Sequence, residues 1–198
     1  MRRSPAHLAF LSASLLVGCK GLGVVPIFTT DTCPYNGLEV ASREVTVERT
    51  LDGDTFETSA GETVRLLGVN APEIEHPTIA EECWGPQSAD WLAGELTGQR
   101  VQLSFDKECT DTYGRTLAYV RMSSTGAGTV VDTGDTADTG GSSGSVEFDL
   151  LINEQSIRLG QSVVYEDFDD IKLRDVLYAA QAVAQRESAG LWGVCEST

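Results

Sequence analysis

Basic residues are scarce in this chain. Its 198 residues include 14 lysines and arginines against 30 aspartates and glutamates, a formal net charge of −16 at pH 7. A protein that coats duplex nucleic acid is normally basic, because neutralising phosphates drives that binding. The composition therefore excludes broad coating of a duplex, although it suits the solubility of a secreted or surface protein. Any contact with nucleic acid must be local and depend on a few arginines.

The chain also lacks an apolar run long enough to span a bilayer. Arg2 and Arg3 precede the short apolar stretch LAFLSASLLV, and small residues follow it. This arrangement is typical of a signal peptide, which we expect over residues 1–18. The segment LVGC resembles the bacterial lipobox, whose cysteine, here Cys19, is lipidated and becomes the mature N-terminus; the alternative is an ordinary secretory signal. We therefore expect an exported protein, either a cell-surface or outer-membrane lipoprotein with one lipid anchor or a secreted one.

No C-x-x-C pair occurs among the cysteines, which argues against the competing interpretation, a zinc site. Without Cys19 the chain has an even number, Cys33, Cys83, Cys109 and Cys195. In an oxidising compartment these are disulfide candidates with three possible connectivities. We prefer Cys83 with Cys109 and Cys33 with Cys195, since the second pair would tie the two ends of the domain together.

Alternating and β-rich segments predict five short strands. Asp52-Gly53 is a hairpin signal between the first two, and Ala60-Gly61 turns the chain into the third. The strands are expected at residues 44–51, 55–59, 63–69, 100–105 and 116–122. Helices are expected from Pro86 to Gly98, at residues 156–160, and over residues 171–190. The pattern predicts an α+β fold that is mainly β: a five-stranded barrel of the oligonucleotide-binding (OB) type with about three helices.

Two helices are expected to pack through one apolar face each. In each helix, apolar residues recur at helical spacing and so lie on one face. They are Ala89, Leu92 and Leu96 in the helix from Pro86 to Gly98, and Leu173, Val176, Leu177, Ala180 and Ala184 in the helix over residues 171–190.

Residues 123–145 are rich in glycine, serine, threonine and aspartate and lack the residues that a core requires. We expect a disordered insert there; its aspartates lack the EF-hand spacing. The expected organisation is a tether at residues 19–42, a domain at 43–195 and a tail at 196–198.

Several charged residues lie where packing alone would not place them. Arg65 interrupts an apolar segment, and burying a guanidinium group is costly unless an anion meets it. Hard oxygens bind Ca²⁺ or Mg²⁺, arginines bind phosphate oxygens, and a glutamate beside a proline can orient or deprotonate water. The candidate set is Asp54, Arg65, Asn70, Glu73, Asp111, Tyr113 and Arg115. Each has a simpler alternative: Asp54 could satisfy turn donors, Arg65 could pair with a structural carboxylate, and Glu73 could be a solvated loop charge.

Five motifs occur in an order that resembles the staphylococcal nuclease (thermonuclease) family. They are DGDT, VRLLGVNAPE, CWGPQSADW, DTYGRTLAYV and GLWGVC, which together run from residue 52 to residue 195. The resemblance extends from about Glu44 to Cys195, interrupted by the insert, and it implies the same OB-type barrel. It also implies a monomeric, calcium-dependent nuclease that hydrolyses DNA or RNA and leaves a 3′-phosphate.

The resemblance also assigns roles to individual residues. For the metal it implies Asp54 as the first carboxylate ligand, Asn70 at the second ligand position and the backbone carbonyl of Ala71. For the reaction it implies Glu73 as the general base that activates water, Arg65 and Arg115 as phosphate clamps, and Tyr113 and Asp111 at the substrate.

Two departures from the family pattern weaken this expectation. Asn70 stands where the family usually has an aspartate, so the metal site loses one charge and should bind calcium less tightly. Thr112 stands where the family often has a lysine before the tyrosine, here Tyr113, and the loss of that positive charge predicts weak binding of long nucleic acid. The alternative function is a catalytically weak or inactive module of this type that binds nucleic acid or a protein partner at the cell surface.

Overall fold

A computed structural model describes residues 42–124, 147–166 and 171–195 of the chain. The expected signal peptide, Cys19, Cys33, nearly all of the tether and of the insert, and the tail lie outside these residues. Among the described residues, no helix is both long and apolar enough to cross a membrane.

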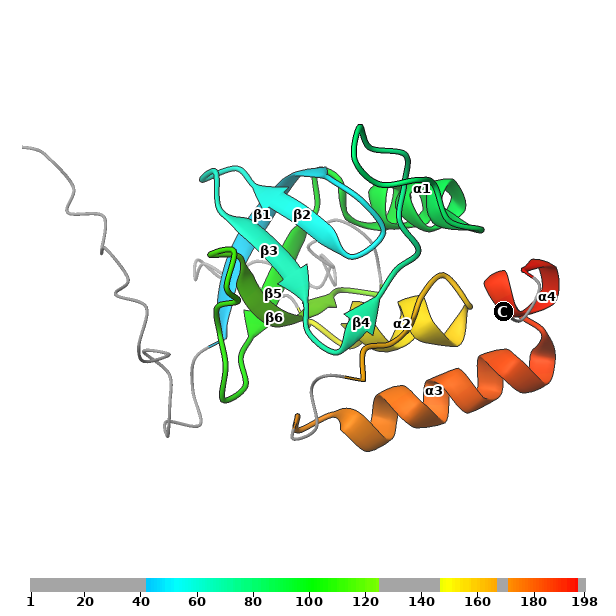
Figure 1. Cartoon of the computed structure of the whole chain (residues 1–198). Helices are drawn as coiled ribbons and strands as arrows, with labels where there is room; N and C mark the ends of the chain where they lie inside the picture. Colours follow the sequence, from blue (N-terminus) through cyan, green and yellow to red (C-terminus); the bar gives the residue numbers. More distant parts are fainter. Residues whose placement is uncertain (1–41, 125–146, 167–170, 196–198) are drawn as a thin grey trace, which may run out of the picture.

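Five strands form a closed barrel, as the sequence predicted (Figure 1). They are β1 (Arg43–Thr50), β2 (Thr55–Thr58), β3 (Thr63–Leu66), β5 (Arg100–Ser104) and β6 (Thr116–Met122). Their order in the sheet is β3-β2-β1-β5-β6, with antiparallel pairs throughout. A parallel pairing of β3 with β6 closes the barrel and sets Arg65 opposite Leu117.

The barrel is closed around apolar side chains that alternate along the strands. Alternation places every second residue on the inner face, where Val47, Phe56, Val64, Val101 and Leu103 are at most 1% exposed. Charged residues on the outer face of the barrel form ion pairs, for example Arg49 of β1 with Glu57 of β2. This rigid barrel is the scaffold that fixes the ends of β3 and β6 relative to each other.

Three helices of at least seven residues pack around the barrel within the described part of the chain. They are α1 (Gly85–Leu96), α2 (Ile152–Arg158) and α3 (Arg174–Glu187), and a single turn, α4 (Leu191–Val194), follows. Figure 1 shows α2 between the barrel and α3, with α4 beyond the end of α3. Short strands complete the fold: β7 (Leu150–Leu151) adds to β6, and β4 (Val69–Asn70) pairs with β8 (Val163–Val164).

A buried asparagine joins α2 to the barrel. The Asn153 amide donates to the carbonyl oxygens of Leu67 (2.9 Å) and Ala118 (3.2 Å), and its oxygen accepts the N–H of Val120 (2.8 Å). These bonds connect the segment after β3 with β6, beside the parallel seam. A fully buried amide is tolerated here because three of its four hydrogen-bonding positions are filled.

Several expected elements differ in extent from those observed. The helix expected at residues 156–160 begins four residues earlier, at Ile152, since Ile152 and Ile157 both enter the core. The third strand stops at Leu66 because Gly68 adopts a left-handed backbone (φ 76°), which separates β4 from β3. In α3, Leu177, Ala180 and Ala184 are buried as expected, but Val176 is 40% exposed.

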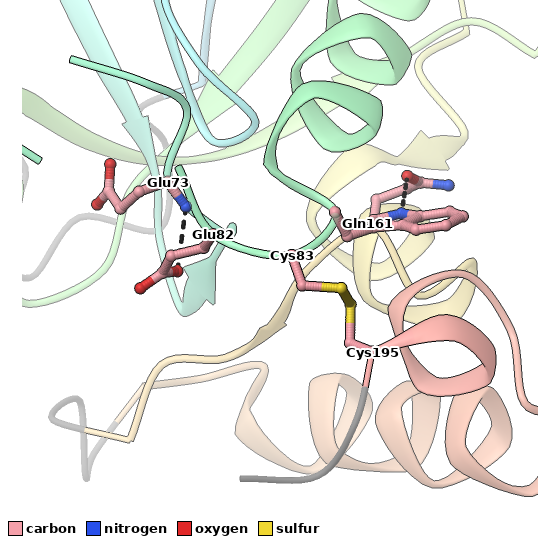
Figure 2. The surroundings of a disulfide bond; sticks show 6 residues. Glu73, Glu82, Cys83, Gln161 and Cys195 are labelled. Atoms are coloured by element: carbon pink, nitrogen blue, oxygen red, sulfur yellow. Dashed lines mark hydrogen bonds between the residues drawn. A yellow bond between two sulfur atoms is a disulfide. The ribbon is translucent and has the colours of Figure 1, made fainter. Parts of the chain in front are cut away.

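The preferred disulfide pairing is wrong. Cys83 is bonded to Cys195, with the two Cα atoms 5.9 Å apart, so neither Cys83–Cys109 nor Cys33–Cys195 can form. Cys109 is disulfide-bonded as well. The physical reason is that the start of α1 and the end of α4 lie side by side (Figure 2). The sequence gives no measure of that proximity, which depends on how the last helices return to the barrel.

Candidate functional site

One cleft of about 540 Å³ contains every predicted catalytic, metal-binding and substrate-binding residue. These residues come from the β1–β2 turn, from β3 and the segment after it, and from the loop before β6. The cleft is lined by Asp54, Arg65, Asn70, Ala71, Glu73, Asp111, Tyr113 and Arg115 among others. Barrel closure through β3 and β6 brings the two arginine-bearing segments together.

Asp54 lies at the bottom of the turn between β1 and β2. The Asp54 N–H donates to Asp52 Oδ1 (2.9 Å), so it is Asp52 that satisfies the turn donor. The Asp54 carboxylate instead accepts the Thr55 hydroxyl (2.9 Å) and the Ala71 N–H (2.8 Å). The alternative interpretation of Asp54 as a turn cap is therefore wrong, and its side chain is held toward the cleft.

Arg65 forms an ion pair with Asp54. Its Nη1 lies 2.8 Å from Asp54 Oδ2, and the two side chains are only 12% and 8% exposed. Arg65 Nη2 also donates to Asn70 Oδ1 at 3.4 Å. The anion that compensates the buried guanidinium is thus a predicted metal ligand, and the pair engages Nη1 of Arg65.

Burial has a strong effect on the Asp54 carboxyl group. It raises the pKa of Asp54 from its ordinary value of 3.8 to about 7; Arg65 and the Ala71 N–H lower the pKa, and Asp52 raises it further. A buried carboxylate with an acidic neighbour is stabilised by additional positive charge. Positive charge added beside Asp54 would favour its ionised form.

Asp111 organises the second arginine. Its Oδ2 accepts the Arg115 Nε–H at 2.6 Å, and its Oδ1 accepts the backbone N–H groups of Tyr113 and Arg115, both at 2.9 Å. Gly114 makes this tight loop possible with a left-handed backbone (φ 82°). Both Asp111 oxygens are engaged with protein donors, which orients Arg115 rather than leaving Asp111 free for substrate.

Tyr113 projects from the same loop into solvent. Its side chain is 84% exposed, and the guanidinium carbon of Arg115 lies 5.3 Å from the centre of its ring. Arg115 thus donates its Nε–H to the Asp111 carboxylate, and its guanidinium carbon lies over the Tyr113 ring. Both Arg115 and Tyr113 line the cleft.

Glu73 is exposed at the edge of the cleft, and its main chain is fixed by a residue that the sequence did not single out. The Glu73 N–H donates to Glu82 Oε2 (3.1 Å), and the Glu82 N–H donates to the Glu73 carbonyl oxygen (2.9 Å). Figure 2 shows the Glu73 carboxylate extending away from this contact. In the sequence Glu82 has the appearance of a solvated charge beside Glu81, so no local signal identified it.

The oxygen atoms near Asp54 are suited to a hard cation. Asp54 and Asn70 contribute side-chain oxygens to the cleft, and Ala71 is held beside Asp54 by its N–H. Within the described ranges, His, Cys, Asp and Glu side chains form no group of three or more that could hold a metal ion. A cation here would therefore rely on one carboxylate plus neutral amide and carbonyl oxygens, which fits weak binding of calcium.

Comparison with known proteins agrees with this geometry. The family model described as staphylococcal nuclease homologue matches residues 63–194. A thermonuclease of Staphylococcus intermedius is 40% identical over 85 residues, which cover 41% of this chain and 51% of that protein. A thermonuclease of Staphylococcus hyicus is 33% identical over 117 residues, covering 56% of this chain and 69% of that protein.

A third relative is Endonuclease YncB of Bacillus subtilis (strain 168), 36% identical over 80 residues, 38% of each chain. The chain thus spans about half the length of the Staphylococcus intermedius relative and less of the Bacillus one. The family model, by contrast, covers about two thirds of this chain, from β3 to α4. The protein therefore belongs to the staphylococcal nuclease family.

Proposed function

We propose that this protein is a calcium-dependent nuclease that hydrolyses phosphodiester bonds of DNA, RNA or both and leaves a 3′-phosphate. The observation that carries the proposal is the gathering of Arg65, Arg115 and Glu73 in one cleft. Relatives named thermonuclease and endonuclease support the same activity. Two guanidinium groups and one carboxylate are the charges needed to hold a phosphate and activate water.

In this proposal each charged side chain has one task. Arg115, oriented by Asp111, and Arg65, after exchanging Asp54 for the substrate, donate to the phosphate oxygens and stabilise the charge of the transition state. Glu73 takes a proton from water, whose oxygen attacks phosphorus in line with the 5′-oxygen. The bond from phosphorus to the 5′-oxygen breaks, that oxygen takes a proton from solvent water, and the second product leaves with a 5′-hydroxyl group.

Calcium would be held by the Asp54 carboxylate, the Asn70 amide oxygen and the Ala71 carbonyl. When bound, it would add positive charge beside the phosphate. The Asp54 carboxyl group is buried, so positive charge beside it would favour its ionised form. A cation there would compete with Arg65 for the carboxylate. Because Asn70 brings no charge, we expect a calcium requirement in the millimolar rather than the micromolar range.

The alternative is a module that binds nucleic acid or a protein partner without cutting. Two observations favour it: Arg65 is tied to Asp54, and Asn70 leaves the metal ligands with one formal charge. Glu73 and both arginines are nevertheless present in the cleft, and a binding module needs no general base. We therefore place hydrolysis first.

The test is cleavage of single-stranded DNA and of RNA by the purified chain while calcium is titrated from micromolar to ten-millimolar levels. Glu73→Gln is the matched control, because it keeps size and polarity but removes the base. We expect calcium-dependent products with 3′-phosphate ends, lost in the control. A folded protein that binds the oligonucleotide without cleaving it at any calcium level would establish the alternative.

We further propose that the chain is exported and acts as a monomer, anchored through lipid on Cys19 or otherwise secreted. The N-terminal sequence supports export and the lipid anchor. Expression of the full chain and of Cys19→Ser in a bacterial host, followed by fractionation, tests it. Release of the variant from the membrane fraction is expected; identical fractionation of the two would contradict lipidation.

A further inference from the structure

The segment that carries Glu73 has little regular structure of its own. Between β4, which ends at Asn70, and α1, which begins at Gly85, the only ladder contact is the bridge between His76 and Ile79. Both main-chain polar groups of Glu73 bond instead to Glu82, near the far end of the segment. The position of Glu73 therefore depends on what holds Glu82.

Gly85 adds a steric contact to these bonds. Its N–H donates to the Glu82 carbonyl oxygen (3.0 Å), and a Cβ placed on Gly85 would lie 2.1 Å from the Glu73 carbonyl oxygen. The Glu73 main chain thus rests directly on the first turn of α1. A small displacement of residues 82–85 would move Glu73 with them.

Residues 82–85 are in turn fastened to the C-terminal part of the fold. Cys83 is bonded to Cys195, directly after α4, and the Trp84 indole N–H donates to Gln161 Oε1 (2.9 Å), as Figure 2 shows. The α4 turn is itself anchored, because the Leu191 N–H donates to the Gly160 carbonyl oxygen (2.9 Å). Glu73 is consequently connected through Glu82 and one disulfide to the layer formed by α2 and α4.

We propose that Glu82, Cys83 and Cys195 form a strap that positions Glu73 for catalysis. The inference rests on the proposed nuclease function and deepens it: the disulfide is a positioning element for the general base, besides stabilising the fold. A general base must be held close to its water, and small misplacements of such groups reduce turnover strongly. The phosphate clamps lie on β3 and on the Asp111 loop, away from the strap, so substrate binding should depend on it little.

The decisive comparison is between Cys83→Ser/Cys195→Ser and Val101→Ala. Val101 is fully buried in β5, so its truncation lowers stability without touching the strap. Substitution is preferable to a reducing agent, because Cys109 is disulfide-bonded too. For the double serine variant we expect kcat to fall about tenfold with KM within about twofold, and for Val101→Ala no comparable loss below its melting temperature.

Glu82 variants test the hydrogen bonds separately. Glu82→Gln keeps an oxygen that can accept the Glu73 N–H and should retain kcat, whereas Glu82→Ala should lose activity as the serine variant does. Equal kcat for Glu82→Ala and the unaltered chain would overturn the proposal. So would a kcat loss in Val101→Ala as large as that in the serine variant at matched thermal stability.

A readout that needs no activity separates this inference from the proposed function. The NMR order parameter of the Glu73 amide should be about 0.85 in the unaltered chain and fall below about 0.6 in the serine variant. If the unaltered chain cleaves nothing, the nuclease proposal fails while this measurement still decides whether the strap orders Glu73. An unchanged order parameter would overturn the strap even in an active enzyme.

Discussion

Replacing Asp54 with asparagine should stabilise the protein increasingly as the pH rises. Burial raises the pKa of Asp54 to about 7 from 3.8, so the folded state binds its proton more tightly than the unfolded state does. Stability from a group with a raised pKa is fully present below the unfolded value and is lost as the pH rises through the folded value. Asparagine has no such proton, so the variant escapes this loss.

The expected magnitude follows from the same two pKa values. Each pKa unit corresponds to about 1.4 kcal/mol, so the complete effect above pH 8 is about 4 kcal/mol. Between pH 5 and pH 8 the unfolding free energy of the parent should fall by about 2 to 3 kcal/mol relative to Asp54→Asn. The change with pH reports the balance between burial, which raises the pKa of Asp54, and the Arg65 pair, which lowers it.

The assay is urea unfolding of both proteins at pH 5, 6, 7 and 8 in the presence of EDTA. The structure contains opposing effects, since Arg65 at 2.8 Å favours the ionised carboxylate and burial disfavours it. A difference that stays constant with pH, or a parent that gains on the variant as the pH rises, would show that Arg65 prevails and would refute the reasoning. With ten-millimolar calcium the parent alone should gain stability, because the variant lacks the charged ligand.

Three further predictions follow from single contacts. Asp111→Asn should lower kcat/KM, measured by steady-state cleavage, about tenfold, because it removes the acceptor of the Arg115 Nε–H. The double variant Asp111→Asn/Arg115→Ala should lose little more activity than Arg115→Ala alone. Asn70→Asp should lower the calcium concentration for half-maximal cleavage, or for half-maximal thermal stabilisation, because it adds a second charged oxygen. Asn153→Leu should reduce the unfolding free energy in urea by about 3 kcal/mol, since it leaves the Val120 N–H and two carbonyl groups without this partner; a loss under about 1 kcal/mol would contradict that account.

Local patterns predicted most of the barrel. Alternation identified β1, the Asp52-Gly53 turn directed the chain into β2, and the seven residues of β6 were predicted at their observed bounds. These features depend on neighbours in the sequence, and side-chain period and turn chemistry encode them directly. The candidate site residues were also identified from sequence, because charges inside apolar segments stand out and because the motif order resembles a known family.

What the sequence did not predict depends on distant parts of the chain. The pairing of Cys83 with Cys195, the contacts between Glu73 and Glu82, and the ion pair of Arg65 with Asp54 form only after the helices and strands have packed. No periodicity reports such contacts, and cysteine counts leave connectivity open. Val176 shows the same limit within a helix: its spacing fits the buried face, yet its side chain is 40% exposed.

The parallel seam between β3 and β6 has a consequence for folding. The seam pairs residues 52 positions apart in the sequence, because β4, α1 and β5 lie between β3 and β6. Contacts of such long sequence separation form slowly, because the entropy of closing the loop is lost before the contact is gained. The seam also joins the segments that carry Arg65 and Arg115. A chain in which this seam is still open therefore cannot present both guanidinium groups to one phosphate, and any hydrolytic activity should appear only after the seam has closed.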